Sequence, residues 1–164
     1  MPDHSASLAD PFIVRPAVLW EAAEIFEVYQ KAFEQLEGRI DPPTSAKSQT
    51  VESLSKSFGR VGIAVCVLGE TIVGCVFFKP DGNGLYLYRL AVSPFHQGKG
   101  VAKRLIAHVV DQARVEGREF VALNVRIPLV DNQRLFQSAG FREVSRHCHE
   151  GYDEETFIRM EYSL

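Results

Sequence analysis

The sequence lacks the features that mark several specialised classes of protein. Its 164 residues contain only three cysteines, and no run reaches the ~18 apolar residues that a membrane-spanning helix needs. The cysteines are odd in number and show no C-x-x-C spacing, so they indicate neither a disulfide framework nor a zinc site (Cys66, Cys75 and Cys148). Residues 1–10 lack a basic stretch followed by an apolar one, which argues against a signal peptide. We therefore expect a cytoplasmic protein with no membrane segment and no metal.

The length and composition favour one globular domain. With 46% hydrophobic and 24% charged residues, the chain can build a sizeable core, and a domain of this length buries roughly 70% of its unfolded surface. These values exclude intrinsic disorder and a small disulfide-stapled module. We expect a single domain over residues 1–164, with residues 1–10 flexible.

The net charge of −3 is unevenly distributed, although its sign argues against a nucleic-acid partner. Residues 16–41 hold six acidic residues against two basic ones. Residues 82–110 hold no acidic residue and four basic ones: Arg89, Lys99, Lys103 and Arg104. The basic window suggests a bound anion, and the acidic window suggests the approach of an amine. Ordinary solvated faces explain the same segregation.

Hydrophobic periodicity and turn residues predict the element order βααβββαβαββ. Strands are expected at 12–15, 63–68, 72–79, 85–92, 120–125, 141–148 and 156–162, and helices at 17–36, 51–58, from 101 onwards and at 131–138. The 85–125 unit is a crossover, so its two strands should lie side by side and parallel in a mixed sheet. The apolar run 120–125 is typical of a strand buried on both faces, and Asp131 is a suitable N-cap.

Residues 93–105 have the composition of a phosphate-binding loop. A strand ends, Gly98 and Gly100 follow, and a helix begins whose first N–H groups have no carbonyl partner. The helix dipole and the neighbouring basic side chains favour an anion there. A Walker loop is absent, and Lys103 replaces the third glycine of a dinucleotide fingerprint. The alternative is a glycine-rich loop that only turns the chain.

Two motifs resemble the GNAT N-acetyltransferase superfamily. Residues 97–102 (QGKGVA) resemble its Q/R-x-x-G-x-G/A signature, and residues 132–141 (NQRLFQSAGF) resemble its N-x-x-L-[YF]-x-x-x-G-F segment. The element order matches from Phe12 to Tyr162. The resemblance implies an α/β fold with a mixed, mostly antiparallel sheet whose central parallel strands splay apart. It also implies acetyl-coenzyme A as the co-substrate.

The same resemblance implies a set of cofactor-binding residues. The strand edge at Leu90, Ala91 and Val92 pairs with the pantetheine arm, and the Val92 N–H is the implied donor to the thioester carbonyl oxygen. The implied pyrophosphate site is the main chain of Gln97, Gly98, Lys99, Gly100, Val101 and Ala102. Lys99 and Arg104 are implied outer phosphate contacts, and Asn132, Leu135 and Phe136 are implied to lie along the pantetheine.

The sequence departs from the family pattern where proton transfer is concerned. Phe136 stands where many members have a tyrosine that protonates the thiolate, and residues 85–89 hold no carboxylate to act as base. The remaining candidates are Tyr88, Glu34 and His149, the last because its pKa is ordinarily near neutral. A half-buried sheet position, a solvated helix end and an exposed loop histidine are the respective alternatives.

These observations predict an N-acetyltransferase that moves an acetyl group from acetyl-coenzyme A to an amine, most simply that of a small molecule. A protein or peptide amine is an alternative acceptor. A non-catalytic, coenzyme A-binding regulatory module is the alternative from a different functional class. The apolar last strands make a homodimer plausible.

Overall fold

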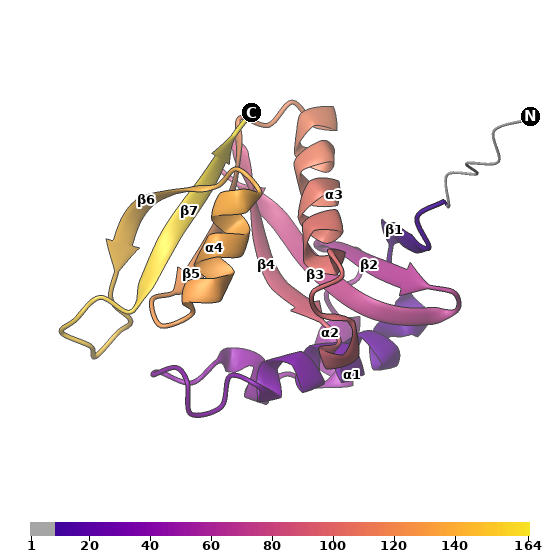
Figure 1. Ribbon diagram of the computed structural model, residues 1–164, viewed down its shortest axis with the longest axis horizontal. Helices are drawn as coiled ribbons and strands as arrows, with labels where there is room; N and C mark the ends of the chain where they lie inside the picture. Colours follow the sequence, from indigo (N-terminus) through magenta and orange to yellow (C-terminus); the bar gives the residue numbers. More distant parts are fainter. Residues whose placement is uncertain (1–8) are drawn as a thin grey trace, which may run out of the picture.

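The computed structural model describes residues 9–164 (Figure 1). The strands are β1 (Phe12–Pro16), β2 (Gly62–Leu68), β3 (Thr71–Asp81), β4 (Gly84–Val92), β5 (Phe120–Arg126), β6 (Arg142–His147) and β7 (Phe157–Ser163). The helices are α1 (Ala22–Glu34), α2 (Val51–Ser55), α3 (Val101–Val115) and α4 (Val130–Ser138), with 3-10 turns η1 (Leu19–Glu21), η2 (Ser45–Ser48) and η3 (Pro94–His96). The element order is the one that the sequence predicts.

The seven strands form one sheet in the order β1-β2-β3-β4-β5-β7-β6. Every neighbouring pair is antiparallel except β4 and β5, which are parallel and register only through Leu85 with Val121 and Tyr86 with Ala122. Beyond these residues the two strands diverge, and the sheet opens between them (Figure 1). The mixed, mostly antiparallel sheet with splayed parallel strands is therefore confirmed.

Helices cover both faces of the sheet. One core cluster joins α1 and α2 to the sheet, with Ile25, Tyr29 and Leu54 at most 2% exposed. The other cluster joins α3 and α4 to the opposite face, with Leu105 fully buried and Phe136 7% exposed. Because side chains alternate along a strand, β4 directs Leu85 and Leu87 to the α3 face and Tyr88 to the α1 face. Among residues 9–164, no helix is long and apolar enough to cross a membrane.

Three expected helix boundaries are wrong. The predicted helix 17–36 begins as the turn η1, because Glu21 accepts the Val18 N–H at 2.9 Å and pairs with Arg15, and α1 itself starts at Ala22. Helix α2 ends at Ser55 rather than at 58. Leu129, not Asp131, occupies the N-cap of α4. The aspartate lies in the first turn, 3.8 Å from Arg134.

Strand β5 is buried on both faces, as predicted, from Val121 to Leu123 but not beyond. Leu123 and Val125 fill the core on the α4 side, but Asn124 is exposed in the middle of the sheet. Asn124 lies beyond Ala122, the last residue of β5 that pairs with β4, and α1 packs on β3 and β4 rather than on this part of β5. Most of the segment expected to be flexible, residues 1–8, lies outside the described residues. Asp10 is described, and it binds Arg104.

Candidate functional site

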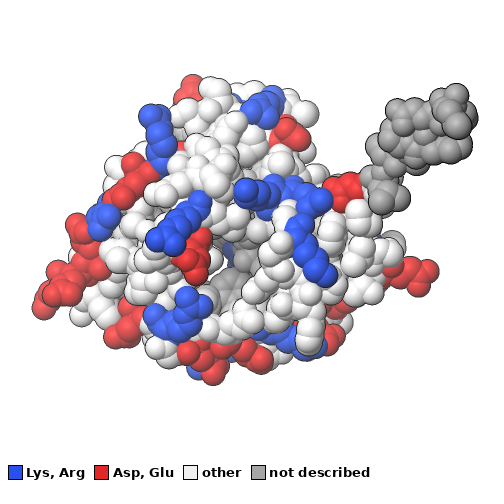
Figure 2. Space-filling model, in the orientation of Figure 1, with Lys and Arg blue, Asp and Glu red and all other residues white. Residues whose placement is uncertain are grey.

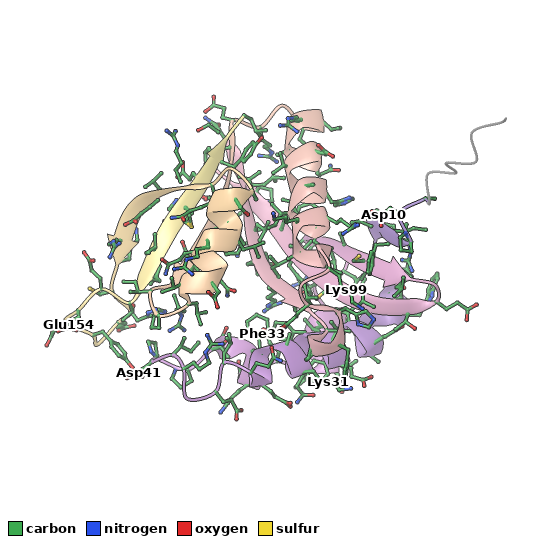
Figure 3. All side chains as sticks on the ribbon, in the orientation of Figure 1. Asp10, Lys31, Phe33, Asp41, Lys99 and Glu154 are labelled. Atoms are coloured by element: carbon green, nitrogen blue, oxygen red, sulfur yellow. The ribbon has the colours of Figure 1, made fainter. Side chains whose placement is uncertain are left out.

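The loop before α3 presents unpaired main-chain N–H groups. Gly98 and Gly100 adopt φ values of +77° and +79°, which are costly for any residue with a Cβ. Gly100 is the N-cap of α3 and provides no capping side chain, so the first N–H groups of this 15-residue helix remain free. Lys99 lies where the loop meets α3 and is exposed (Figure 3). The helix dipole and the free donors make this end of α3 suited to an anion.

Arg104 fixes the shape of this loop. Its Nη1 donates to the Lys99 carbonyl oxygen at 3.0 Å, and its Nε donates to Asp10 Oδ2 at 2.7 Å. The guanidinium also lies over the Phe12 ring, 4.8 Å from its centroid. A Cβ added to Gly100 would stand 2.8 Å from Arg104 Nη1. Arg104, expected as an outer phosphate contact, therefore braces the loop in this structure.

A second contact ties the loop to α1. Gln97 Nε2 donates to Gln35 Oε1 at 3.0 Å, just beyond the last residue of α1. Nearby, His96 Nδ1 is buried and has no hydrogen-bond partner among the described residues. The end of β4, the loop and the end of α1 are thus joined on one side of the opening.

The free edge of β4 faces the divergence from β5. Ser93 N–H donates to Val73 O at 2.8 Å, and the register pairs Ala91 with Cys75 and Val92 with Gly74. In an antiparallel pair the hydrogen-bonded positions alternate, so the N–H and C=O of Val92 point away from β3. Leu90 has the same orientation as Val92. These groups lie on the edge where an extended ligand can add as a strand.

The opening between the two half-sheets is lined by polar side chains. Tyr86 and Tyr88 of β4 and Asn124 of β5 share the face opposite to α3 and α4, as strand alternation requires. Figure 2 shows the molecule hollowed between α3 and α4, with Lys and Arg side chains on both sides. The part of the opening on the face of Tyr86, Tyr88 and Asn124 is the candidate acceptor cleft.

Tyr88, the predicted acid or base on β4, is half-buried in an aromatic cluster. Its ring stacks on Tyr86 at 5.8 Å and tilts against Phe77 at 5.7 Å, while Lys79 Nζ lies 5.0 Å from its centroid. Burial raises the pKa of Tyr88 above its ordinary 10.0, with the Arg89 charge opposing the shift. The phenol therefore stays protonated at neutral pH, and only a donor role suits it.

His149 lies in the β6–β7 connection, beside the carboxyl end of β5. Its ring Nδ1 hydrogen-bonds to the Thr156 hydroxyl, and its ring packs edge-on against Phe157 at 4.9 Å. Burial lowers the pKa of His149 below 6.5, and the charge of Arg126 adds to the shift. A neutral imidazole at physiological pH is the form that a general base needs.

Glu34, the third catalytic candidate, is exposed at the end of α1. It lines a shallow pocket of about 130 Å³ between α1 and η2, together with Phe33 and Lys47. Glu37 lines the same pocket but pairs with Lys47 at 3.2 Å. None of the hydrogen bonds or ion pairs in residues 9–164 connects Glu34 with His149 or Val92.

The candidate residues of α4 differ in accessibility. Asn132 is exposed, Leu135 is half-buried, and Phe136 is 7% exposed with its ring edge-on to Phe141 at 6.1 Å. Phe136 belongs to the core cluster beneath α3 and α4. Its side chain has no proton to transfer.

The residues that join the two halves across the opening do not stand out in the sequence pattern. Tyr152 donates a hydrogen bond to Asp41 Oδ1, and Arg126 Nη1 donates to the Pro42 carbonyl oxygen at 2.6 Å. Figure 3 shows Asp41 below the loop that carries Glu154. The sequence feature that could have pointed to Arg126 is its position as a basic residue at the end of a mostly apolar strand.

The comparison with protein families assigns most of the chain. Residues 22–141 match the model described as "Acetyltransferase (GNAT) family". The chain belongs to the GNAT acetyltransferase family. The match contains both the glycine loop and the diverging strands β4 and β5.

Curated relatives of this GNAT protein align with about half of it or less. N-acetyltransferase 8B of Rattus norvegicus is 32% identical over 52% of this chain and 41% of its own length. N-acetylaspartate synthetase of Homo sapiens is 32% identical over 52% of this chain and 29% of its own. The [ribosomal protein bS18]-alanine N-acetyltransferase of Haemophilus ducreyi is 34% identical over 36% of this chain and 41% of its own. The chain thus spans less than half the length of each.

Solved GNAT structures share the fold of this chain over nearly its whole length. The PaiA N-acetyltransferase of Thermoplasma acidophilum, solved with coenzyme A, has a TM-score of 0.78 at 18% identity, covering 93% of this chain and 99% of its own. YncA of Salmonella typhimurium, solved with acetyl-CoA, has a TM-score of 0.71 at 20% identity, covering 94% of each. Within residues 9–164 of the GNAT chain, no group of three or more His, Cys, Asp and Glu is placed to hold a metal.

Proposed function

We propose that this protein is an N-acetyltransferase that moves an acetyl group from acetyl-coenzyme A to an amine. The observation that carries the proposal is the meeting of two main-chain features at one opening. The glycine loop at the start of α3 offers free N–H donors, and the β4 edge at Val92 offers further unpaired groups where β5 diverges.

The residues present fit acetyl-coenzyme A. The N–H groups from Gly98 to Ala102 suit a pyrophosphate, and the open edge at Leu90 and Val92 suits the amides of an extended pantetheine arm. When bound, the coenzyme supplies an activated thioester. The Val92 N–H is then the donor to the carbonyl oxygen on which negative charge develops.

Proton transfer falls to residues around the cleft. An attacking amine must be neutral, so a base has to take its proton, directly or through one water. His149 has the residue type and the lowered pKa for this role. Tyr88 stays protonated and is the phenol proposed as the acid, because Phe136 has no hydroxyl.

The acceptor is proposed to be the amine of a small molecule. The names of two relatives, an N-acetylaspartate synthetase and a ribosomal-protein alanine N-acetyltransferase, concern an amino acid and a protein alanine. Both names concern amine acceptors, which supports acetyl transfer to an amine as the reaction class. Because one of them is a protein amine, a peptide amine is the alternative acceptor.

One observation favours a second function, a coenzyme A-binding module without catalysis. Phe136, at the position where many family members have the acidic tyrosine, is buried against Phe141 and offers no proton. A thiolate leaves adequately at neutral pH, so this replacement does not itself prevent transfer. The two functions share the cofactor site and differ in turnover.

The test is thiol release from acetyl-coenzyme A in the presence of free amino acids, short peptides and polyamines. Acetyl transfer requires saturable release that depends on the amine. Gly100→Glu, which places a carboxylate at the phosphate site, should abolish coenzyme binding and release together. If the protein binds coenzyme A tightly but no amine in the panel increases thiol release, the proposed acetyl transfer is wrong and the non-catalytic binding module is favoured.

A further inference from the structure

Arg126 ends β5 on the open face of the sheet. Leu123 and Val125 of the same strand belong to the core beneath α3 and α4, so Asn124 and Arg126 face the other way. Arg126 Nη1 donates to Pro42 O at 2.6 Å, and Nη2 lies 3.4 Å from Pro43 O. The loop between α1 and α2 therefore holds the guanidinium at the cleft.

This guanidinium has unused hydrogen-bonding capacity. It carries five N–H donors in a planar fork, and two of them are directed at carbonyl oxygens. None of the ion pairs in residues 9–164 includes Arg126, although the side chain is part-buried. Burial lowers the pKa of Arg126 below its ordinary value, yet an arginine keeps its charge at any physiological pH. Its remaining donors are available to an acceptor from outside the chain.

Asp41, the carboxylate whose charge acts on Arg126, already has a hydrogen-bond partner. Asp41 accepts the hydrogen bond of Tyr152 and acts on Arg126 only at longer range. Asp81 and Glu161 both pair with Arg159, at 2.9 and 3.0 Å. Arg159, which pairs in register with Asn124, is thus bound by carboxylates, whereas no ion pair of the described residues includes Arg126.

Arg126 also lies opposite the acyl-transfer edge. Val92 is six residues beyond Tyr86, the last paired residue of β4, and Arg126 is four residues beyond Ala122, its partner on β5. Because the strands are parallel, Val92 and Arg126 end the two arms that border the same opening. A molecule bound between the arms can present one group to each.

We propose that Arg126 binds a carboxylate of the acceptor, so that the acceptor is an amine that also carries a carboxylate. The inference deepens and rests on the proposed acetyl transfer. Arg126 takes the carboxylate through its fork, which orients the amine towards the Val92 edge. Of the acidic residues 16–41, from which a cationic partner was expected, Asp41 lies at this wall, where it accepts the hydrogen bond of Tyr152. Glu34 and Glu37 of that segment lie at the separate pocket of α1.

The experiment compares matched pairs of amines that differ only in the carboxylate. Aspartate against asparagine tests a side-chain carboxylate, and alanine against alaninamide tests an α-carboxylate. Affinity for the coenzyme A-saturated protein is measured by calorimetry, and turnover by thiol release from acetyl-coenzyme A. Because a charge-assisted, bidentate contact is at stake, we expect the carboxylate member of at least one pair to bind about tenfold more tightly.

Substitutions separate recognition from a structural role. Arg126→Gln should reduce the preference within the pair to about one, because the carboxylate member loses more affinity than the amide, and coenzyme affinity should not change. Arg126→Lys should retain part of the preference because the charge remains. Arg142→Gln is the matched control, since Arg142 is exposed on β6 with no ion pair in the described chain. Equal losses for both members of a pair in Arg126→Gln would mean that Arg126 only holds the Pro42–Pro43 loop, and this would overturn the proposal.

The outcomes distinguish this inference from the proposed function. Thiol release from amines without any carboxylate preference in the wild type overturns the role of Arg126 and leaves acetyl transfer standing. A carboxylate preference in binding that vanishes in Arg126→Gln, with no release from any amine, supports Arg126 and overturns catalysis. Failure of every carboxylate-bearing amine to bind also overturns the inference.

Discussion

The Tyr152 hydroxyl donates a hydrogen bond to Asp41, which lies 111 residues earlier in the chain. The contact joins the β6–β7 loop to the α1–α2 loop. Together with the bond from Arg126 to Pro42, it links the two halves of the molecule on the acceptor side of the opening. The cofactor edge at Val92 belongs to one half and His149 to the other, so this link sets how the two approach each other.

Tyr152→Phe should loosen the acceptor side without affecting the coenzyme. The variant removes the donor to Asp41 and retains the ring packing against His149. We expect faster hydrogen exchange in residues 38–44 and a several-fold higher KM for the acceptor, with unchanged coenzyme A affinity. Tyr162→Phe is the control, because its hydroxyl accepts from Arg114 at 3.0 Å, away from the cleft. An unchanged exchange rate in Tyr152→Phe would contradict this account.

Gly100→Ala should weaken coenzyme binding by about tenfold or more, because the loop must abandon a conformation that costs a residue with a Cβ roughly 1–2 kcal/mol. The added Cβ also meets Arg104 Nη1 at 2.8 Å. Calorimetry with coenzyme A measures the effect. Gly117→Ala provides the control, since Gly117 has a φ of +69° at the other end of α3 and no atom near its added Cβ. Gly117→Ala should lower the stability of the protein but leave its affinity for coenzyme A unchanged. If both variants lose similar affinity, the effect of Gly100→Ala is not specific to the glycine loop.

His149 should govern the acidic limb of the pH profile. A base works when unprotonated, and the pKa of His149 lies below its ordinary 6.5 because of burial and the Arg126 charge. We therefore expect kcat/KM to fall as the pH drops through a value below 6.5, and His149→Asn to remove that limb and slow the reaction. His147→Asn, an exposed neighbour bonded to Ser145, should keep the profile. If the acidic side of the kcat/KM profile is unchanged in His149→Asn, another residue is the base.

Glu21→Gln should destabilise the entry into α1 by about 2 kcal/mol, because it breaks charge-assisted bonds of a part-buried carboxylate. The Arg15 guanidinium and the Val18 N–H hold the pKa of Glu21 below 4.5. A lowered carboxyl pKa adds stability that is complete above the unfolded value and is lost as pH falls through the folded one. Urea unfolding should show a difference from wild type at pH 7 that shrinks below pH 4.5. Glu27→Gln, whose pair with Lys31 is exposed, should leave the free energy of unfolding nearly unchanged.

Local chemistry explains why the glycine loop was predictable from the sequence. Gly98, Gly100 and the helix that follows define their own backbone geometry, and the element order follows from periodicity. The start of α1 was not predictable from the sequence, because it depends on contacts of Glu21 with Arg15 and Val18. Such contacts leave no periodic signal.

The acceptor side depends on long-range geometry that the sequence pattern does not contain. The exposure of Asn124 follows from the divergence of β4 after Tyr86, which is a property of the sheet and not of either strand. The position of Arg126 further depends on the carbonyl of Pro42 in a loop far along the chain. The free edge at Val92 likewise follows from the register with Gly74.

The most direct test of the central claim is an amide-resolved NMR titration of the protein with coenzyme A. The account predicts that the largest shifts fall on the N–H groups of Leu90 and Val92 and on residues 98–102, with small shifts in β1, β6 and the surface of α1. Binding that leaves Val92 and the glycine loop unshifted, or that shifts another surface, would contradict the assignment of this opening as the cofactor site.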